Sequence, residues 1–274
     1  MIIDSHQHFW NYDPVRDAWI DTSMVAIKKD FLPKDFFPIL KANTIDGCIA
    51  VQADQSETET EFLLQCAEKN PFIKGVVGWV DLTSNILEER LKYYASNPLF
   101  KGVRHIVQAE SDDYLMRKDV QNGIGKLSKH GLTYDILVFP HQLPSAIALV
   151  EAFPHQKFIL DHIAKPTISI PVNEKWEYNI KQLSKHKNVY CKLSGMVTET
   201  INFKFKDDDF KPYIDVVFKA FGPDRIMFGS DWPVCLLAAK YDKVFKIVND
   251  YLENHSVEIK NNILGKNAIK IYNL

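Results

Sequence analysis

The chain has 274 residues, of which 46% are hydrophobic and 25% are charged, as is typical of a folded globular protein. Its formal net charge of −2 excludes a global positive field that would attract nucleic acid or anionic lipid. The sequence has no run of about 18 apolar residues and begins MIIDSHQH, without an export signal. We therefore expect a cytoplasmic protein with neither a nucleic-acid partner nor a membrane partner.

The predicted strands are eight short apolar segments that are rich in β-branched residues and bounded by turn residues. They span residues 2–9, 46–53, 73–82, 100–108, 132–139, 157–164, 188–196 and 225–233. Runs of this length and composition are typical of strands that are covered on both faces.

The predicted helices lie between these strands, at residues 33–43, 57–70, 117–131, 142–154, 174–187 and 208–222, with room for two more after 236. Strands that alternate with helices predict right-handed crossovers and a closed α/β barrel of the (β/α)8 TIM type, with extra C-terminal helices. We expect one domain over residues 1–274. An open doubly wound sheet is the alternative, but the first strand ends in SHQHFWNYDP, without the glycines of a nucleotide-binding turn.

The four cysteines are scattered along the chain, and no Cys-x-x-Cys pair occurs. They are Cys48, Cys66, Cys191 and Cys235. This pattern favours free, buried thiols in a reducing compartment. A thiol nucleophile at Cys235 is the remote alternative.

Polar residues at the C-terminal ends of the predicted strands are the candidates for an active site, because barrel enzymes build their sites there. His6 and His8 follow the first strand and point to the same face, since side chains two apart on a strand do so. Together with His162 and Asp231 they would complete a four-ligand set for one divalent metal ion. A metal-free, hydrogen-bonded cluster around a water molecule is equally compatible with these four groups.

Asp231 lies in FGSDWPV, between Gly229 and Pro233, where the last strand should end. The functional interpretation is a general base that takes a proton from water. The alternative is a turn in which the carboxylate only caps backbone amides.

Further candidates for substrate contact come from the same strand ends and the loops that follow. Arg104 and His105 are adjacent, so only one of them can point into the barrel, and a surface salt bridge is the alternative for Arg104. The remaining candidates are Trp10, Gln52, Trp79, His141 and Lys192. The irregular segment 10–32 follows the first strand, so we expect it at the catalytic end.

Five motifs in order, DSHQHFW, GVRH, LDHIAKP, CKLSG and FGSDWPV, resemble the amidohydrolase-related family. The lactonase-like branch, which includes L-fuconolactone, L-rhamnonolactone and 2-pyrone-4,6-dicarboxylate hydrolases, is the most similar. The resemblance covers residues 2 to about 235. It implies a distorted barrel that hydrolyses a ring ester. By the same resemblance His6, His8 and His162 line the catalytic centre, Asp231 activates water, and Arg104 polarises or anchors the lactone carbonyl or a nearby carboxylate.

The sequence departs from many members of the wider superfamily on its fourth and fifth strands. Where they have a carboxylated lysine and a histidine, this chain has KGVRHI and LTYDILV. We therefore expect no bridged two-metal centre, and either no cofactor or one divalent metal ion, with zinc favoured.

The leading functional hypothesis is hydrolysis of a neutral, sugar-derived lactone by base-activated water, in carbohydrate catabolism. One alternative is a zinc-dependent decarboxylase or hydrolase of an aromatic or muconate-type acid. The other is a non-catalytic protein that binds a sugar acid. The oligomeric state is not predicted.

Overall fold

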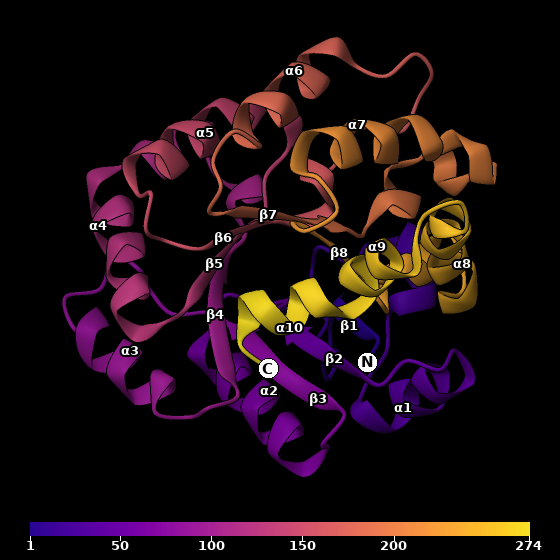
Figure 1. The fold of residues 1–274 in the computed structure, drawn as a ribbon. Coiled ribbons are helices and arrows are strands. Elements are labelled where there is room, and N and C mark those ends of the chain that lie inside the picture. Colours follow the sequence, from indigo (N-terminus) through magenta and orange to yellow (C-terminus); the bar gives the residue numbers. More distant parts are fainter.

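The computed structural model describes residues 1–274 and contains eight parallel strands with helices between them (Figure 1). The strands are β1 (Ile3–Gln7), β2 (Gly47–Val51), β3 (Ile73–Gly78), β4 (Phe100–His105), β5 (Thr133–Ile136), β6 (Phe158–Leu160), β7 (Val189–Leu193) and β8 (Ile226–Phe228). They form one sheet in the order β1 to β8, and each strand pairs in parallel with the next. The predicted (β/α)8 barrel is confirmed.

The helices surround the strands. They are α1 (Pro33–Ala42), α2 (Glu57–Lys69), α3 (Leu87–Ala95), α4 (Lys118–Leu127), α5 (Leu143–Ala152), α6 (Glu174–Leu183), α7 (Lys211–Phe221), α8 (Tyr241–Leu252), α9 (Val257–Asn261) and α10 (Asn267–Tyr272). Each predicted helical segment contains one of them. Helix α3 is an addition to the prediction, and it buries Leu87, Leu91 and Tyr94, which share one face at helical spacing. No helix combines the length and the apolar character that a membrane crossing requires.

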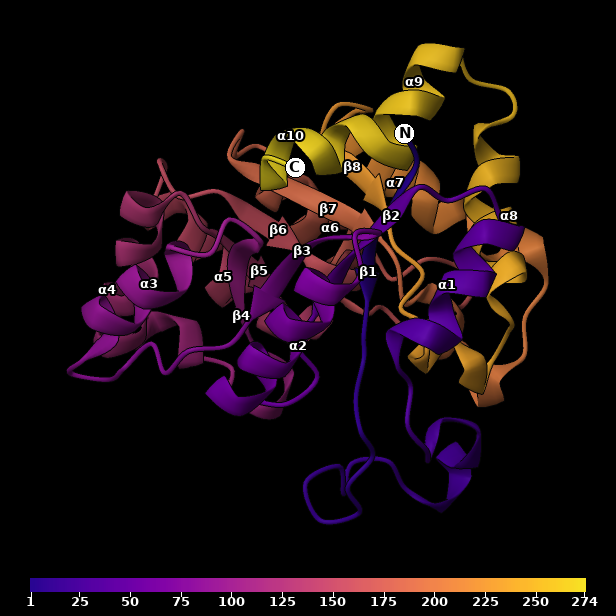
Figure 2. The same cartoon turned by 90° about the horizontal axis from the view of Figure 1, so that it is seen from below.

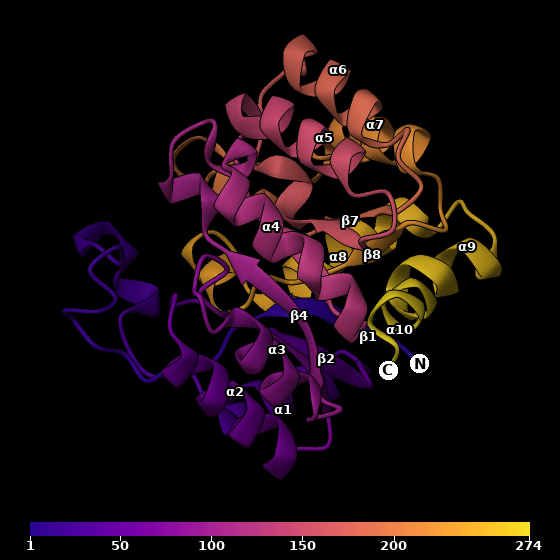
Figure 3. The same ribbon diagram turned by 90° about the vertical axis from the view of Figure 1, so that its left-hand side faces the viewer.

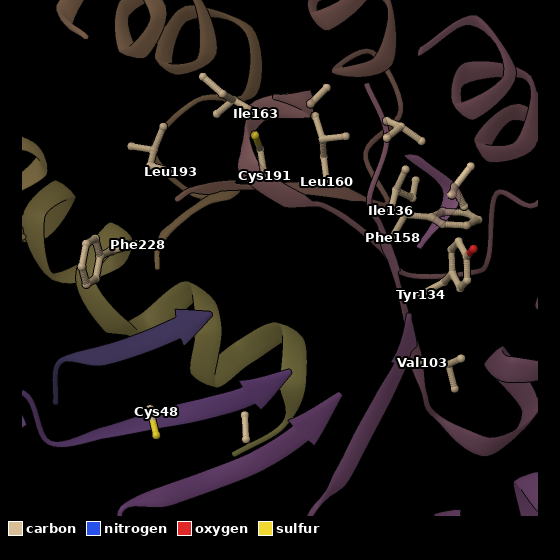
Figure 4. Packing of buried hydrophobic residues seen from close by; sticks show 14 of the residues in the cluster. Cys48, Val103, Tyr134, Ile136, Phe158, Leu160, Ile163, Cys191, Leu193 and Phe228 are labelled. Carbon is tan, nitrogen blue, oxygen red and sulfur yellow. The ribbon is translucent and has the colours of Figure 1, made fainter. Parts of the chain in front are cut away.

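The main core lies between the outer side of the strands and the ring of helices. Figure 4 shows side chains of this layer, among them Val103, Tyr134 and Phe158, on the side of the strands that faces the helices. All four cysteines are buried and free, as predicted. Burial of apolar surface in this layer is the main force that holds the helices to the barrel.

A second, smaller core fills one end of the barrel interior. Ile49, Val77 and Ile159 pack there against Ile271 and Tyr272 of α10. Figures 1 and 2 show α10 lying across this end, beside both chain termini. The segment between β1 and α1 projects from the opposite end (Figures 2 and 3).

The barrel closes between β8 and β1 through few backbone contacts. A single parallel bridge joins Gln7 to Trp232. Asp231 N donates to His6 O at 2.8 Å, and His8 N donates to Trp232 O at 2.7 Å. This seam therefore brings the His-x-His segment of β1 beside the aspartate that follows β8.

Candidate active site

Three imidazoles surround one carboxylate at the seam. His8 Nε2 lies 3.2 Å from Asp231 Oδ1, His6 Nε2 lies 3.8 Å from it, and His162 Nε2 lies 3.9 Å from it. His6 Nε2 and His8 Nε2 are 3.2 Å apart. All four side chains are buried. We refer to His6, His8, His162 and Asp231 as the histidine–aspartate centre.

Oxygen acceptors orient His6 and His8. His8 Nδ1 lies 2.8 Å from Val51 O, and because a carbonyl only accepts, we assign the proton of His8 to Nδ1. His6 Nδ1 lies 3.3 Å from Asp161 Oδ1, an acceptor, and 3.2 Å from Lys192 Nζ, a donor, so we assign the proton of His6 to neither nitrogen. The lone pair of His8 Nε2 then faces His6 Nε2 and Asp231 Oδ1. Two acceptors such as His8 Nε2 and Asp231 Oδ1 repel at this spacing unless a proton, a water molecule or a cation lies between them.

His162 is presented by a left-handed turn. His162, Ile163, Ala164 and Lys165 have φ values of 52°, 49°, 62° and 50°. Left-handed helical backbone costs about 1–2 kcal/mol for each residue other than glycine, and such strain is concentrated at functional sites. Burial of Ile163 and Ala164 and a 2.8 Å hydrogen bond from Trp176 Nε1 to Ile163 O stabilise the turn.

The ring of His162 packs closely against the end of β7. Its Nδ1 lies 2.9 Å from Ser194 Oγ, a hydroxyl that can donate or accept. A Cβ atom added to Gly195 would lie 2.5 Å from His162 Nδ1. Because Gly195 also has a φ of 63°, both its conformation and its lack of a side chain are needed here.

Burial and mutual contacts set the charges of the centre. Burial acts to raise the pKa of Asp231, but the adjacent imidazoles of His162, His8 and His6 outweigh it and hold this pKa below the usual value of a carboxyl group. Burial lowers the pKa of His162 to about 4 and holds the pKa of His6 well below its ordinary value. At neutral pH the centre thus contains an ionised carboxylate beside neutral His6 and His162.

A buried ion-pair network supports His6. Lys192 Nζ lies 2.6 Å from Asp135 Oδ2, 3.0 Å from Asp161 Oδ1 and 3.2 Å from His6 Nδ1, and none of the three charged side chains is exposed. Tyr272 of α10 donates a 2.8 Å hydrogen bond to Asp135 Oδ2. The network therefore links the C-terminal helix to the histidine–aspartate centre.

Arg104 completes the network, and its five N–H groups all have protein acceptors. Its Nη1 donates to Asp161 Oδ2 at 3.1 Å and to His6 Nε2 at 3.2 Å. Its Nε and Nη2 donate to the side-chain oxygen of Gln52 at 3.2 and 2.9 Å, and Nη2 also donates to the Gln52 carbonyl. Arg104 thus offers its positive charge and orients His6, and it keeps no free donor.

A pocket of about 310 Å³ opens beside the centre. His8, His162, Asp231 and Arg104 form part of its wall. Other lining residues are apolar, among them Trp10, Trp19, Ile106, Leu137 and Val234, and a few are polar: Gln55, Gln108 and Lys165. A small apolar-walled cavity with convergent polar groups suits a small ring molecule.

Five predicted substrate-contact residues do not line this pocket: Gln52, Trp79, His105, His141 and Lys192. Gln52 holds Arg104, and Lys192 is sealed inside the ion-pair network. Trp79 Nε1 donates to His105 Nδ1 at 3.2 Å, and His105 Nε2 pairs with Glu110 at 3.0 Å. His105 therefore faces away from the barrel interior, and of the adjacent pair it is Arg104 that points inward.

His141 lies on an exposed turn. Its side chain is 57% exposed, and its Nε2 lies 3.2 Å from Asp112 Oδ1. An exposed pair of this kind contributes little energy and makes no contact with the pocket. Substrate contact by His141 is not supported.

Several residues of the site were not predicted from the sequence. Gln55, Gln108 and Lys165 line the pocket, and Asp135 holds Lys192. The first three lie beyond the strand ends, Gln108 in a short 3-10 helix (Val107–Ala109), and strand alternation does not indicate which way a side chain points there. The one available signal was Lys165 within the LDHIAKP motif.

The donor set fits one divalent metal ion. One ligand atom from each of His6, His8 and Asp231 lies within 4.8 Å of the others. Ligand atoms on a tetrahedral zinc ion, at bond lengths of about 2.0–2.1 Å, lie roughly 3.3 Å apart, close to the spacing of these three groups. A second set of donors comprises His6, Asp161 and His162. The ammonium of Lys192 already lies 3.0 Å from Asp161 Oδ1, so a second ion would meet a fixed positive charge.

Comparison with known proteins gives consistent results. A sequence profile described as amidohydrolase matches residues 3–274. A relative named L-fucono-1,5-lactonase, from Burkholderia multivorans, is 36% identical over 284 residues, which are 99% of this chain and 96% of the relative. A relative of the same name from Burkholderia ambifaria is 35% identical over 243 residues, 87% of this chain and 82% of its own length. The crystal structure of an amidohydrolase from Burkholderia multivorans with bound zinc is 36% identical, covers 100% of this chain and 99% of its own, and superposes with a TM-score of 0.96.

Proposed function

The chain belongs to the amidohydrolase family, and from that premise we propose that it is a lactonase that opens a sugar-derived lactone, such as L-fuconolactone or L-rhamnonolactone, to the sugar acid. The observation that carries the proposal is an ionised Asp231 among neutral imidazoles at the wall of a small pocket. The two relatives named L-fucono-1,5-lactonase support the substrate class.

No serine, threonine or cysteine lines the pocket, which favours attack by water. Cys235 is fully buried, and burial raises the pKa of its thiol well above the usual value. It does not line the pocket. A thiol-ester intermediate at Cys235 is therefore not supported.

In the proposed reaction the carboxylate of Asp231 takes a proton from a water molecule, and the resulting hydroxide adds to the lactone carbonyl carbon. The tetrahedral oxyanion is stabilised by the charge of Arg104 and by His162, whose Nε2 can carry a proton when Ser194 donates to Nδ1. Collapse of the intermediate breaks the bond between the carbonyl carbon and the ring oxygen. Protonated Asp231 returns its proton to the leaving alkoxide, which gives the open hydroxy acid.

A divalent ion such as zinc would be held by His6, His8 and Asp231, and it would supply a bound water of lowered pKa. His8 is prepared for that role because its Nδ1 proton is directed to Val51 O, and His6 Nδ1 lies 3.3 Å from Asp161 Oδ1. Arg104 would give up its contact with His6 Nε2 and keep Asp161 and Gln52 as partners.

The alternative of an aromatic-acid decarboxylase has less support. A carboxylate substrate would lie against the ionised Asp231 and would need an unpaired cation beside it. Arg104 is paired with Asp161, and Lys165 is paired with Glu199 at 3.0 Å. The charges of the pocket therefore favour a neutral substrate.

The proposal is tested by following acid release from L-fucono-1,5-lactone, from 2-pyrone-4,6-dicarboxylate and from a plain aromatic ester, with and without a chelator. Spontaneous ring opening in buffer provides the blank. We expect enzyme-dependent opening of the sugar lactone, faster than that of the dicarboxylate. A sugar lactone that opens no faster than the blank, under both conditions, would refute the function.

A further inference from the structure

Two polar side chains at the pocket have unused hydrogen-bonding capacity. Lys165 lines the pocket, and its side chain is only 17% exposed. Its ammonium has three donors, and its one polar partner is Glu199 Oε1 at 3.0 Å. Two N–H groups of a largely buried cation are thus left without a protein acceptor. These N–H groups are therefore available to a ligand or a water molecule in the pocket.

Gln108 presents the complementary feature. It also lines the pocket, and its Oε1 atom is buried without a hydrogen-bond partner. An unmatched buried acceptor calls for the same explanation as an unmatched donor. The pocket wall therefore includes one cation with unused donors and one neutral amide whose oxygen has no protein partner, in addition to the groups that the proposed reaction employs.

The backbone positions Lys165 for a role at the pocket. It ends the left-handed turn that begins at His162, so the two residues that reach the pocket lie three positions apart on a strained segment. Glu199, whose side chain is also 17% exposed, balances the charge of Lys165 without using its remaining donors. The Lys165–Glu199 pair therefore has no net charge, and Lys165 still has N–H groups that can donate.

We propose that Lys165 and Gln108 are substrate-binding residues that recognise hydroxyl groups of the lactone, with Lys165 donating to a hydroxyl oxygen and Gln108 Oε1 accepting from a hydroxyl. This inference rests on the proposed lactonase function and narrows its substrate class to neutral, polyhydroxylated lactones. A hydroxyl group donates and accepts, so it matches both side chains. A site built to bind hydroxyls discriminates strongly against analogues that lack them, because its buried polar groups are then left unpaired.

The test compares kcat/KM for L-fucono-1,5-lactone with kcat/KM for δ-valerolactone, which has the same ring size without hydroxyls. In Lys165→Met and in Gln108→Leu we expect the ratio of the two values to fall at least tenfold, mainly through KM for the hydroxylated lactone. Lys165→Arg keeps the charge and the donors and should retain the ratio within threefold. Lys246→Met breaks an exposed ion pair with Asp250 on α8 and serves as the matched control.

A purely structural role would lower both kcat/KM values together and leave their ratio unchanged, which would overturn the assignment. Thermal unfolding of each variant shows whether the chain is folded. If the wild type opens both lactones and the variants keep the same ratio of kcat/KM values, only this inference is refuted. Absence of wild-type activity on both lactones refutes the proposed function on which it rests.

Glu199→Gln provides an independent test, because it removes the carboxylate that balances Lys165 and keeps the side chain's size. The freed ammonium should then attract an anionic substrate. We expect the activity on a carboxylated six-membered lactone to rise at least threefold relative to the activity on L-fucono-1,5-lactone. An unchanged or reduced relative activity would contradict a pocket-facing charge on Lys165.

Discussion

Asp231 Oδ1 lies 3.2 Å from His8 Nε2, although the two residues are 223 positions apart in the chain. Backbone hydrogen bonds between the two strand ends hold them in place, from Asp231 N to His6 O and from His8 N to Trp232 O. The contact exists only when β8 has closed against β1. The reactive group thus depends on closure of the barrel, and its geometry depends on the residues that support the seam.

Gly195→Ala should impair catalysis by displacing His162. The new Cβ atom would lie 2.5 Å from His162 Nδ1, so the ring must move, and a displacement of about 1 Å at a reacting group can cost roughly 100-fold in rate. We expect kcat to fall at least tenfold, as measured by acid release at saturating lactone.

Gly131→Ala is the control for this substitution. Gly131 has a φ of 71°, and a Cβ atom there meets nothing within 4 Å. Both variants carry similar backbone strain, on the order of 1–2 kcal/mol, but only Gly195→Ala has the clash. Equal effects of the two substitutions on kcat would show that the packing of Gly195 against His162 is unimportant.

Lys192→Met should destabilise the fold severely. The substitution leaves Asp135 and Asp161 buried without their shared cation, and removal of one partner from a buried ion pair typically costs about 3–5 kcal/mol. Lys181→Met, which breaks the exposed pair with Glu177, should cost less than about 0.5 kcal/mol. Urea unfolding of both variants measures the difference. Comparable losses in the two would contradict the role of Lys192 in holding the network.

Zinc binding should not exceed one equivalent per chain. His6, His8 and Asp231 can hold one ion, whereas Lys192 lies beside the second donor set. Equilibrium dialysis of the chelator-treated chain measures the stoichiometry. His8→Gln removes one of the three metal ligands and should weaken zinc binding by at least about tenfold. Even the loss of a residue that only hydrogen-bonds to a ligand weakens metal binding by about that factor. The exposed His141→Gln should leave binding unchanged, and two tightly bound ions would contradict this account.

Activity should persist into mildly acidic solution. Burial lowers the pKa of His162 to about 4, so its imidazole is neutral above that pH and gains a proton only as the pH falls through about 4. The imidazolium would then pair with the carboxylate of Asp231, 3.9 Å from His162 Nε2, and weaken it as a base. We expect kcat/KM for the lactone to be nearly constant between pH 7.5 and 5.5 and to fall near pH 4, after subtraction of spontaneous opening. Circular dichroism at each pH verifies the fold. Half-maximal activity near pH 6.5, the ordinary value for histidine, would show that His162 is not buried as described.

The repeating pattern of apolar segments predicted the barrel because each strand is buried on both faces and each helix on one, and local sequence records both features. The sequence also indicated His6 and His8 as a pair, because strand alternation relates residues two apart. Helix α3 shows the same kind of signal, since Leu87, Leu91 and Tyr94 have helical spacing. It could have been predicted.

Contacts between side chains far apart in the sequence could not be predicted from such patterns. Asp135 and Lys192 are 57 positions apart, and their 2.6 Å contact depends on how strands β5 and β7 face the interior. The same holds for Arg104, whose donors are all taken by groups brought together by the fold. Lys165 and Gln108 lie after their strands, where the path of the chain, and not a period of two, decides what reaches the pocket.

The most direct test of the account is the rate of lactone opening by Asp231→Asn. Asparagine has the same size and tolerates the left-handed conformation of Asp231, whose φ is 58°, but it cannot take a proton from water. We predict a fall in kcat of about 100-fold or more, with KM and the thermal unfolding midpoint little changed. A kcat within threefold of the wild-type value would contradict the claim that the carboxylate at the seam activates water.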